Sequence, residues 1–345
     1  MKKKEIILKG HSGPQPPNLG GLSSENILRM VNEALDALPY DRRPASLYEP
    51  VKYVLSLGGK RIRPVLMLLA YNLYKDNPAD IMMQALALET YHNYTLLHDD
   101  LMDNADLRRG HETVHKRWDA NTAILTGDSM LVLAYQRMQQ CPKENLQAVM
   151  DVFTETALEI GEGQQYDMDF ETQRVVTIPE YMEMIRLKTA VLLATSLQMG
   201  AMIAGADEED QKHLYDFGIA LGLAFQLQDD VLDCYSDVAV FGKVTGGDIV
   251  ENKKTMMYLK TLELASPDER ERLEALFSGE IDINTQRKID EVIALYDKLN
   301  VREFLERLMA DYFRQATACL DAVKLPEERK VHLRHYADLL SGREK

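Results

Sequence analysis

Apolar side chains recur every three or four positions along almost the whole chain from Ser23 onward, a spacing that predicts amphipathic helices. The first such segment places Ile27 and Val31 on one side and ends at Pro39. Clusters of Gly, Pro, Asn and Asp separate further helices, which we expect at residues 46–57, 62–75, 79–103, 120–140, 143–170, 180–204, 208–236, 248–265, 268–277, 285–299, 301–323 and 327–340. So many helices without alternating strands predict an all-α fold.

Evidence for strands is almost absent from this pattern. One β-branched cluster, Val175–Ile178, is followed at once by Pro179, so we interpret it as a connection between helices. No repeat of 20–50 residues suggests a solenoid. No linker-like change in composition divides residues 22–345, which we therefore expect to form one domain.

The N-terminal segment has a different character. Residues 1–21 combine a basic start with only a three-residue apolar block and a run rich in Pro and Gly, so we expect a disordered or expression-derived leader. The apolar block is too short for a signal peptide, and the run Pro64–Tyr71 is far shorter than the roughly 20 residues that span a membrane. The expected location is the cytoplasm, with no stable membrane insertion.

Charge and cysteine content exclude several classes of function. The formal net charge is −15, which argues against nucleic-acid binding through a basic surface. The cysteines, Cys141, Cys234 and Cys319, form no CxxC pair, so a reducing compartment is expected and a disulfide framework or zinc site is not.

Two acidic clusters share the pattern DDxxD and lie 130 residues apart, at 99–103 and 229–233. Each follows a long apolar helical segment. Positions i and i+4 share a helix face, so Asp99 lies beside Asp103, and the outer aspartates of the second cluster are paired in the same way. Such like charges repel. Mg²⁺ relieves the repulsion, because it takes carboxylate oxygens and commonly bridges them to substrate phosphates.

Cationic residues accompany these acids. A GGKRIRP segment spans residues 58–64, and Arg108–Gly110 follows the first acidic cluster closely. Further cations occur at Lys188, Lys243 and Lys253, and His92 lies two helical turns before the first cluster. This mixture in an acidic protein favours a polyanionic ligand that is held partly through metal and partly by direct ion pairs.

Together these residues resemble the trans-isoprenyl diphosphate synthases, or polyprenyl synthetases, from about residue 24 to the C-terminus. The motifs that carry the resemblance are GGKRIRP at 58–64, HNYTLLHDDLMDNADLRRG at 92–110, TGD at 126–128, GEGQQYDMD at 161–169, KT at 188–189, FQLQDDVLD at 225–233, FGK at 241–243 and GGDIVENKKT at 246–255. The resemblance implies a multi-helix bundle around a deep central cavity, a homodimer, and Mg²⁺-dependent head-to-tail condensation of isopentenyl diphosphate with allylic diphosphates.

The resemblance also implies roles for individual residues. Three Mg²⁺ ions, replaceable by Mn²⁺, would be held with substrate by Asp99, Asp103 and Asp229, with support from Asp100, Asp230 and Asp233 as ligands or through water. Contacts to the allylic diphosphate would come from Arg108, Lys188, Lys243 and Lys253. Contacts to isopentenyl diphosphate would come from Lys60, Arg63, His92 and Arg109. Thr189 and Gln226 would present oxygens to the allylic carbocation.

The product tail is expected to run from the metals toward the N-terminus of the helix that carries Asp99. Thr95 lies one turn back from that residue, and Tyr94, one residue further, is the first bulky side chain able to floor the pocket. A plain DDxxD with an aromatic five positions before it resembles the short-chain geranylgeranyl type. We therefore expect C15 to C20 products, with C20 favoured. A deeper residue such as Tyr91 is the alternative floor, and a medium- or long-chain synthase is the alternative activity.

Other functions account for less of the sequence. Glu89–His92 and Glu112–His115 are both ExxH, the motif of di-iron bundles, but only 23 residues separate them. A non-catalytic partner subunit should have lost aspartates or cations, yet every identifiable motif position is filled. A terpene cyclase or head-to-head synthase would not be expected to combine GGKRIRP, RRG and both DDxxD clusters.

Overall fold

The computed structural model describes residues 22–235, 246–279 and 283–342. The predicted leader at 1–21 and the predicted ligand Lys243 lie outside these ranges. The elements before the centre of the chain are α1 Ser24–Asp36, α2 Ala45–Ser56, α3 Ile62–Asn72, η1 Pro78–Ile81, α4 Met82–Met102, β1 Leu107–Arg108, β2 His111–Glu112, α5 Val114–Arg117, α6 Ala120–Met138 and α7 Lys143–Thr172. The remainder are α8 Ile178–Ile185, η2 Arg186–Ala190, α9 Val191–Ala204, α10 Glu208–Tyr235, α12 Gly247–Val250, α13 Met256–Leu264, α14 Pro267–Ser278, α15 Thr285–Lys298, α16 Val301–Ala322 and α17 Glu327–Leu340.

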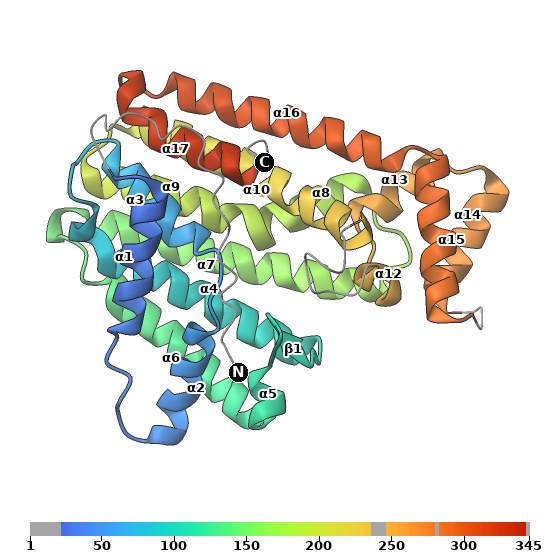
Figure 1. Ribbon diagram of the computed structural model, residues 1–345, viewed down its shortest axis with the longest axis horizontal. Coiled ribbons are helices and arrows are strands. Elements are labelled where there is room, and N and C mark those ends of the chain that lie inside the picture. The colour runs from blue at the N-terminus through green and yellow to red at the C-terminus, as the bar shows by residue number, and fades with distance from the viewer. Residues whose placement is uncertain (1–21, 236–245, 280–282, 343–345) are drawn as a thin grey trace, which may run out of the picture.

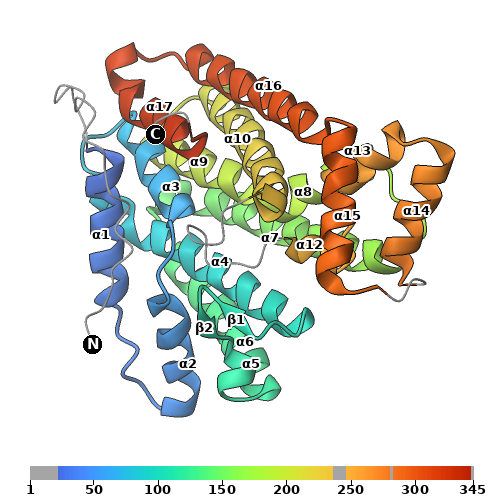
Figure 2. The same ribbon diagram turned by 45° about the vertical axis from the view of Figure 1, so that its right-hand side comes forward.

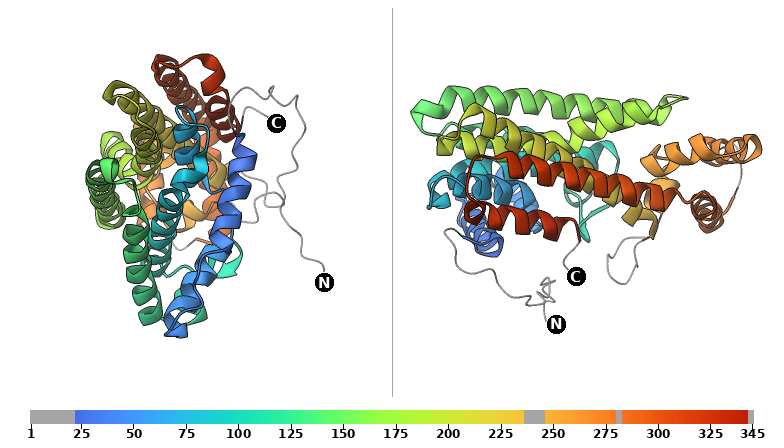
Figure 3. Two further views of the ribbon diagram at one scale, coloured as in Figure 1. Left: turned by 90° about the vertical axis from the view of Figure 1, so that its left-hand side faces the viewer. Right: turned by 90° about the horizontal axis from the view of Figure 1, so that it is seen from above.

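The helices α4, α9 and α10 lie at the centre of the bundle (Figure 1). Helix α10 packs along α9 and α16, while α4 packs against α3 and α6. Figure 3 shows α7 and α16 on opposite sides of the layer formed by α9 and α10. Helices α13, α14 and α15 gather at the end of α16 that lies away from α17 (Figure 2). The all-α prediction is confirmed.

Two apolar clusters make up the core. The larger joins residues of α1 to α4, α6 and α9 to the first half of α10. The smaller joins α8 and the second half of α10 to α13, α14, α15 and the start of α16. Ile219, Met309 and Tyr312 pack against both clusters, so α10 and α16 connect them. The acidic end of α10 is consequently held by the smaller cluster, and the acidic end of α4 by the larger one.

The helix α9 is buried along nearly its whole length. Together with α8 and η2 it forms a continuous helix, Ile178–Ala204, which is long and apolar enough to cross a membrane by length and composition. In the described part of the chain it alone meets that test, and 72% of its most apolar window is buried inside the bundle. Such burial is what a core helix of this composition requires.

Three local features differ from the prediction. Residues 107–112 form a two-stranded hairpin, which the sequence pattern did not indicate. The expected helix at 180–204 contains the π-helical turn η2. The expected helix at 248–265 is two helices, α12 and α13, because Asn252 adopts a left-handed conformation with φ of 59° and interrupts the helical bonding. All three departures occur next to cationic residues of the predicted site.

Candidate active site

The first acidic cluster ends α4 and is surrounded by cations. Asp99 is half-buried and pairs with Lys188 Nζ at 3.1 Å and with Arg108 Nη2 at 3.5 Å. Asp103 is the C-cap of the helix. Desolvation and the nearby Asp99 carboxylate raise the pKa of Asp103, while Lys253 and Lys188 oppose that shift. The predicted residues Asp99, Asp103, Lys188 and Lys253 therefore lie in one electrostatic neighbourhood.

The second aspartate of each cluster points into the protein. Asp100 is 5% exposed and accepts a hydrogen bond of 2.8 Å from Arg108 Nε. Asp230 is 2% exposed and accepts one of 2.6 Å from the Tyr181 hydroxyl, and burial raises the pKa of Asp230 to about 8. By contrast, Asp229 is exposed at the end of α10. Burial thus separates the two neighbours in each pair into an accessible and an inaccessible carboxylate.

The last aspartate of the second cluster fixes the chain that follows the described gap. Asp233 Oδ2 accepts a hydrogen bond of 3.0 Å from the Asp248 backbone N–H, and the Asp233 carbonyl accepts one of 2.7 Å from Gly246 N–H. Because α12 begins at this point, the carboxylate holds the start of the GGDIVENKKT segment against α10.

A cavity of about 150 Å³ opens between α7, α8, α10 and the segment joining α12 to α13. The predicted residues that line it are Lys188, Thr189, Gln226 and Lys253. Thr189 Oγ1 donates to Gln226 Oε1 at 3.0 Å. Lys254 also reaches this cavity, but its Nζ donates to the Phe170 carbonyl at 2.5 Å, at the end of α7. The ammonium of Lys253 instead pairs with Glu251 at 2.8 Å.

The π-helical turn η2 places Lys188 toward the acids. Its ammonium lies 2.6 Å from Asp167 Oδ2 on α7 as well as 3.1 Å from Asp99. Burial alone would lower the pKa of Lys188, but these two carboxylates raise it. Gly163 of α7 makes the close approach possible, since a Cβ there would lie 2.4 Å from the Lys188 backbone nitrogen.

The GGKRIRP segment supplies both structural and free cations. Arg61 is buried and pairs with Glu89 at 2.6 Å, so it serves the core. Arg63 Nε is also buried, yet it has no hydrogen-bond partner among the described residues. Burial lowers the pKa of Arg63 to about 10. Lys60 is exposed, with its ammonium 5.2 Å from the centre of the Phe225 ring.

His92 completes a group of cations without a matching acid. Burial, followed by the charges of Arg63 and Arg109, holds the pKa of His92 well below its ordinary value, so the imidazole is neutral at pH 7. A buried guanidinium nitrogen without a partner, beside other cations, is costly unless an anion reaches it. These residues therefore form an anion-binding pocket on the side of α4 that faces the GGKRIRP segment.

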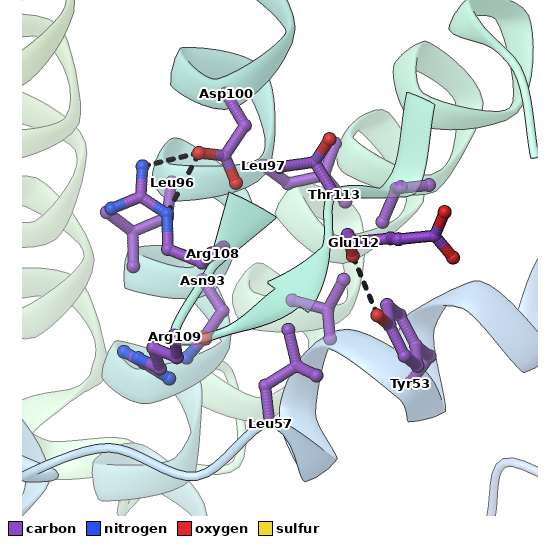
Figure 4. Close-up of a pocket in the computed structure, with 12 residues that line it drawn as sticks. Tyr53, Leu57, Asn93, Leu96, Leu97, Asp100, Arg108, Arg109, Glu112 and Thr113 are labelled. Carbon is purple, nitrogen blue, oxygen red and sulfur yellow. Dashed lines mark hydrogen bonds and ion pairs between the residues drawn. The ribbon is translucent and has the colours of Figure 1, made fainter. Parts of the chain in front are cut away.

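The hairpin positions Arg108 and Arg109 differently (Figure 4). Arg109 and Gly110 both have positive φ, at 54° and 76°, and Arg108 pairs with His111, which is a type I′ turn. Arg108 reaches Asp100, whereas Arg109 Nη1 donates to the Gly58 carbonyl. The hairpin is fixed to α2 by the Tyr53 hydroxyl, which donates to the Glu112 carbonyl at 2.7 Å, above a cavity of about 20 Å³.

The predicted chain-length residues lie on different sides of α4. The Tyr94 ring packs edge-on against Tyr91 and His98, with centroid distances of 5.4 and 5.0 Å. Tyr91 is buried, packs against Phe153 of α7, and donates to the Ala157 carbonyl at 3.3 Å. Thr95 is half-buried and donates its hydroxyl to the carbonyl one turn back. An aromatic stack thus continues from Tyr94 toward α7.

The donor set suits a metal that is shared with a ligand. Within the described ranges, no three His, Cys, Asp or Glu side chains converge to hold a metal ion alone. This excludes the alternative di-iron centre there, and Glu89 of its ExxH motif is already paired with Arg61. Asp99, Asp103 and Asp229 offer hard carboxylate oxygens beside lysines, which fits Mg²⁺ completed by phosphate oxygens and water.

Sequence reasoning missed Tyr181, Asp167 and the separation between the two aspartates of each pair. Tyr181 resembles an ordinary core aromatic in an apolar helix, so the sequence carries no signal for its contact. Asp167 stands within GEGQQYDMD, four residues after Gly163, and that spacing on a helix face could have indicated it.

Comparisons with known proteins agree with this geometry. Residues 44–296 match the model of the polyprenyl synthetase family. A geranylgeranyl diphosphate synthase of Methanosarcina mazei is 35% identical over 317 residues, covering 91% of this chain and 95% of that protein. A geranylfarnesyl diphosphate synthase of Natronomonas pharaonis is 34% identical, covering 91% of this chain and 95% of that protein. A crystal structure of a geranylgeranyl pyrophosphate synthase superimposes with a TM-score of 0.88 at 44% identity, covering 94% of this chain and 100% of the other. The chain therefore belongs to the polyprenyl synthetase family and is a prenyltransferase with the all-α isoprenoid synthase fold.

Proposed function

We propose that this protein condenses isopentenyl diphosphate head-to-tail with allylic diphosphates and releases short-chain prenyl diphosphates of C15 to C20, with C20 favoured. The observation that carries the proposal is the pairing of two different anion sites across the end of α4. One contains carboxylates interleaved with Lys188 and Lys253, and the other contains Arg63, His92 and Arg109 without a matching acid. A reaction that joins two diphosphates requires both.

The acidic site suits the allylic diphosphate. Members of this family generally use a divalent metal, and we propose three Mg²⁺ ions, with Mn²⁺ able to substitute, held by Asp99, Asp103 and Asp229. The metal supplies positive charge that stabilises the departing diphosphate. Lys188 and Lys253 contribute fixed positive charge to the same group. Arg108, which is bound to Asp100, and Lys243, which lies outside the described residues, complete the proposed contacts.

The carbon chemistry needs a dry cavity and correctly aimed oxygens. Loss of the allylic diphosphate leaves a carbocation, and the double bond of isopentenyl diphosphate attacks it before a proton is lost. Thr189 and Gln226 line the cavity and present oxygen atoms to the developing positive charge. Apolar neighbours such as Met184 and Ile185 exclude water, which would otherwise capture the cation.

The cationic pocket suits isopentenyl diphosphate. Arg63 has a buried nitrogen that awaits an acceptor, and Arg109 is held close to the glycines of the GGKRIRP segment. Lys60 remains exposed at its rim. A diphosphate that binds here also stabilises a proton on His92, because the new negative charge opposes the cations that depress its pKa.

Product length is proposed to depend on Tyr94 and Thr95. Tyr94 leads an aromatic stack that continues through Tyr91 to Phe153, which supports a floor near this depth. Relatives named as geranylgeranyl and geranylfarnesyl diphosphate synthases are about equally similar to this chain, so length must be measured. Tyr94→Ala should lengthen the product and Thr95→Phe should shorten it. An unchanged distribution in Tyr94→Ala would assign the floor to Tyr91 or another helix.

A homodimer in the cytoplasm completes the proposal. Large apolar side chains are exposed on neighbouring helices, at Leu125 and Val132 of α6 and Leu158 of α7, each about 60% or more accessible. A second copy would bury this face, since monomers rarely leave such residues together in water. Light scattering at micromolar concentration should give twice the chain mass, and Val132→Asp should shift it toward the monomer. A monomeric wild type would contradict this assembly.

The decisive experiment supplies labelled isopentenyl diphosphate with dimethylallyl, geranyl or farnesyl diphosphate and separates the products by chromatography. We expect C15 to C20 products that require Mg²⁺. Asp99→Ala and Asp229→Ala should lower turnover by orders of magnitude while circular dichroism shows an intact helical fold. If the wild type consumes no isopentenyl diphosphate with any starter, a cyclase or a non-catalytic subunit becomes the better explanation.

A further inference from the structure

Tyr181 makes a buried contact that no predicted motif includes. It lies on α8, whose start is fixed by a capping box between Thr177 and Glu180, and its side chain is 3% exposed. Its hydroxyl donates to Asp230 Oδ2 at 2.6 Å, and the Met256 backbone N–H donates to the same oxygen at 3.2 Å. Two donors from α8 and α13 therefore hold one oxygen of the carboxylate away from the diphosphate side.

The other carboxylate oxygen determines how the Gln226 amide is turned. Asp230 Oδ1 accepts a hydrogen bond of 3.4 Å from Gln226 Nε2, one helical turn earlier on α10. An amide that directs its NH₂ group at a carboxylate must direct its oxygen the opposite way. That oxygen accepts the Thr189 hydroxyl proton at 3.0 Å.

The direction of this relay decides what Thr189 offers to the cavity. A hydroxyl has one proton and two lone pairs, so a proton given to Gln226 leaves the lone pairs available for the cavity. Lone pairs stabilise a developing allylic cation, whereas an O–H proton aimed at it would be repelled. If Gln226 turned its amide over, Thr189 would lose its acceptor and its proton could face the cavity.

We infer that Tyr181 is a positioning residue that acts through Asp230 and Gln226 to aim the lone pairs of Thr189 at the reacting carbon, and that Asp230 orients this relay and is not a metal ligand. The inference rests on the proposed function, because it assigns the residues that prepare the same cavity for ionisation. The hydroxyl of Tyr181 is the first member of the relay, and it can be removed without creating a cavity or a new polar group.

The test compares Tyr181→Phe with Tyr74→Phe. The control also removes a tyrosine hydroxyl that donates to an aspartate of α10, since Tyr74 binds Asp210 Oδ2 at 2.9 Å, but it does so at the opposite end of that helix. We expect Tyr181→Phe to lower kcat by about 10- to 100-fold, as is usual when an orienting partner is removed. The KM for the allylic diphosphate and the Mg²⁺ concentration for half-maximal rate should change by less than about twofold. Tyr74→Phe should match the wild type.

Asp230→Asn provides a second variant. It keeps the shape of the side chain but presents an NH₂ group to the cavity network, which should overturn the Gln226 amide and lower kcat in the same way. Crystal structures of the metal-free proteins provide a readout that does not depend on activity. They should show the contact between Thr189 Oγ1 and Gln226 Oε1 in the wild type and its loss in both variants.

Two outcomes would overturn the inference. A kcat within about twofold of wild type in Tyr181→Phe, with the Thr189–Gln226 contact retained, would show that Tyr181 only fills space. A large rise in the Mg²⁺ requirement of Asp230→Asn, with kcat restored at saturating metal, would make Asp230 a ligand. Failure of the proposed function has a different signature, because the wild type itself would then form no prenyl product.

Discussion

The contact between α7 and η2 gives a sharp test of how this fold positions Lys188. Gly163 of α7 faces the backbone of the π-helical turn, and Gly163→Ala adds a Cβ that would lie 2.4 Å from the Lys188 backbone nitrogen and 2.8 Å from its Cα. Neither neighbour is a flexible side chain that could rotate away. One of the two helical segments must therefore move.

The size of the movement sets the expected loss. Ordinary contact begins near 3.4 Å, so the backbone of η2 must retreat by roughly 1 Å. Overpacking of this kind costs about 1–3 kcal/mol of stability. The same displacement pulls the Lys188 ammonium away from Asp99 and Asp167, which it contacts at 3.1 and 2.6 Å. A misplacement of about 1 Å in a reacting group can lower the rate by about 10²-fold.

The assay is steady-state prenyl transfer together with thermal unfolding. We expect Gly163→Ala to lower kcat by about 10- to 100-fold and the melting temperature by a few degrees. Gly161→Ala is the matched control, because it lies two residues earlier on α7 and a Cβ there meets nothing within 4 Å. The control should keep full activity and gain up to about 1 kcal/mol from helix propensity. Equal behaviour of the two variants would refute the idea that this glycine positions Lys188.

Three further predictions follow from single contacts. Burial and neighbouring arginines depress the pKa of His92 well below 6.5, so as pH falls through 6.5 the unfolded chain gains a proton that the folded chain does not. Unfolding free energy therefore falls, and urea titrations at about pH 7.5 and about 5.5 should show a smaller loss in His92→Gln. Gly59→Ala would place a Cβ 2.8 Å from the Arg109 guanidinium carbon, so kinetics should show a higher KM for isopentenyl diphosphate with little change for the allylic substrate. Lys253→Ala should lower kcat for allylic ionisation, whereas Lys254→Ala should mainly lower the melting temperature, because Lys254 binds a carbonyl at the end of α7. A larger kcat loss in the second variant would exchange their roles.

Much of the helical frame could be predicted because its signals are local. The 3.6-residue spacing of apolar positions and the Pro and Gly residues between helices place the long helices α4, α7, α10 and α16 close to their expected bounds. The sharing of a face by Asp99 and Asp103 follows from helix geometry alone. Such features need no knowledge of what packs against the helix.

The features that could not be predicted depend on tertiary contacts. The hairpin has strands of two residues, too short for an alternating pattern, and its turn uses Arg109–Gly110 in place of the usual Asn-Gly. The π-helical turn adds one residue to a helical turn without any change in composition, and its neighbour Gly163 lies on another helix. Both features aim cations, Arg109 and Lys188, which the sequence could name but not place.

The paired aspartates show why a motif does not state the role of each of its members. In DDxxD the first two residues are identical, and they lie about 100° apart on a helix. In this bundle that rotation sends Asp99 and Asp229 toward the site, and sends Asp100 and Asp230 into the protein, against Arg108 and Tyr181 respectively. The inner carboxylates therefore hold an arginine on the hairpin and an amide on α10, so one motif supplies both the accessible anions and the means of orienting their neighbours. The physical environment, which differs by one residue in sequence, divides the chemistry between them.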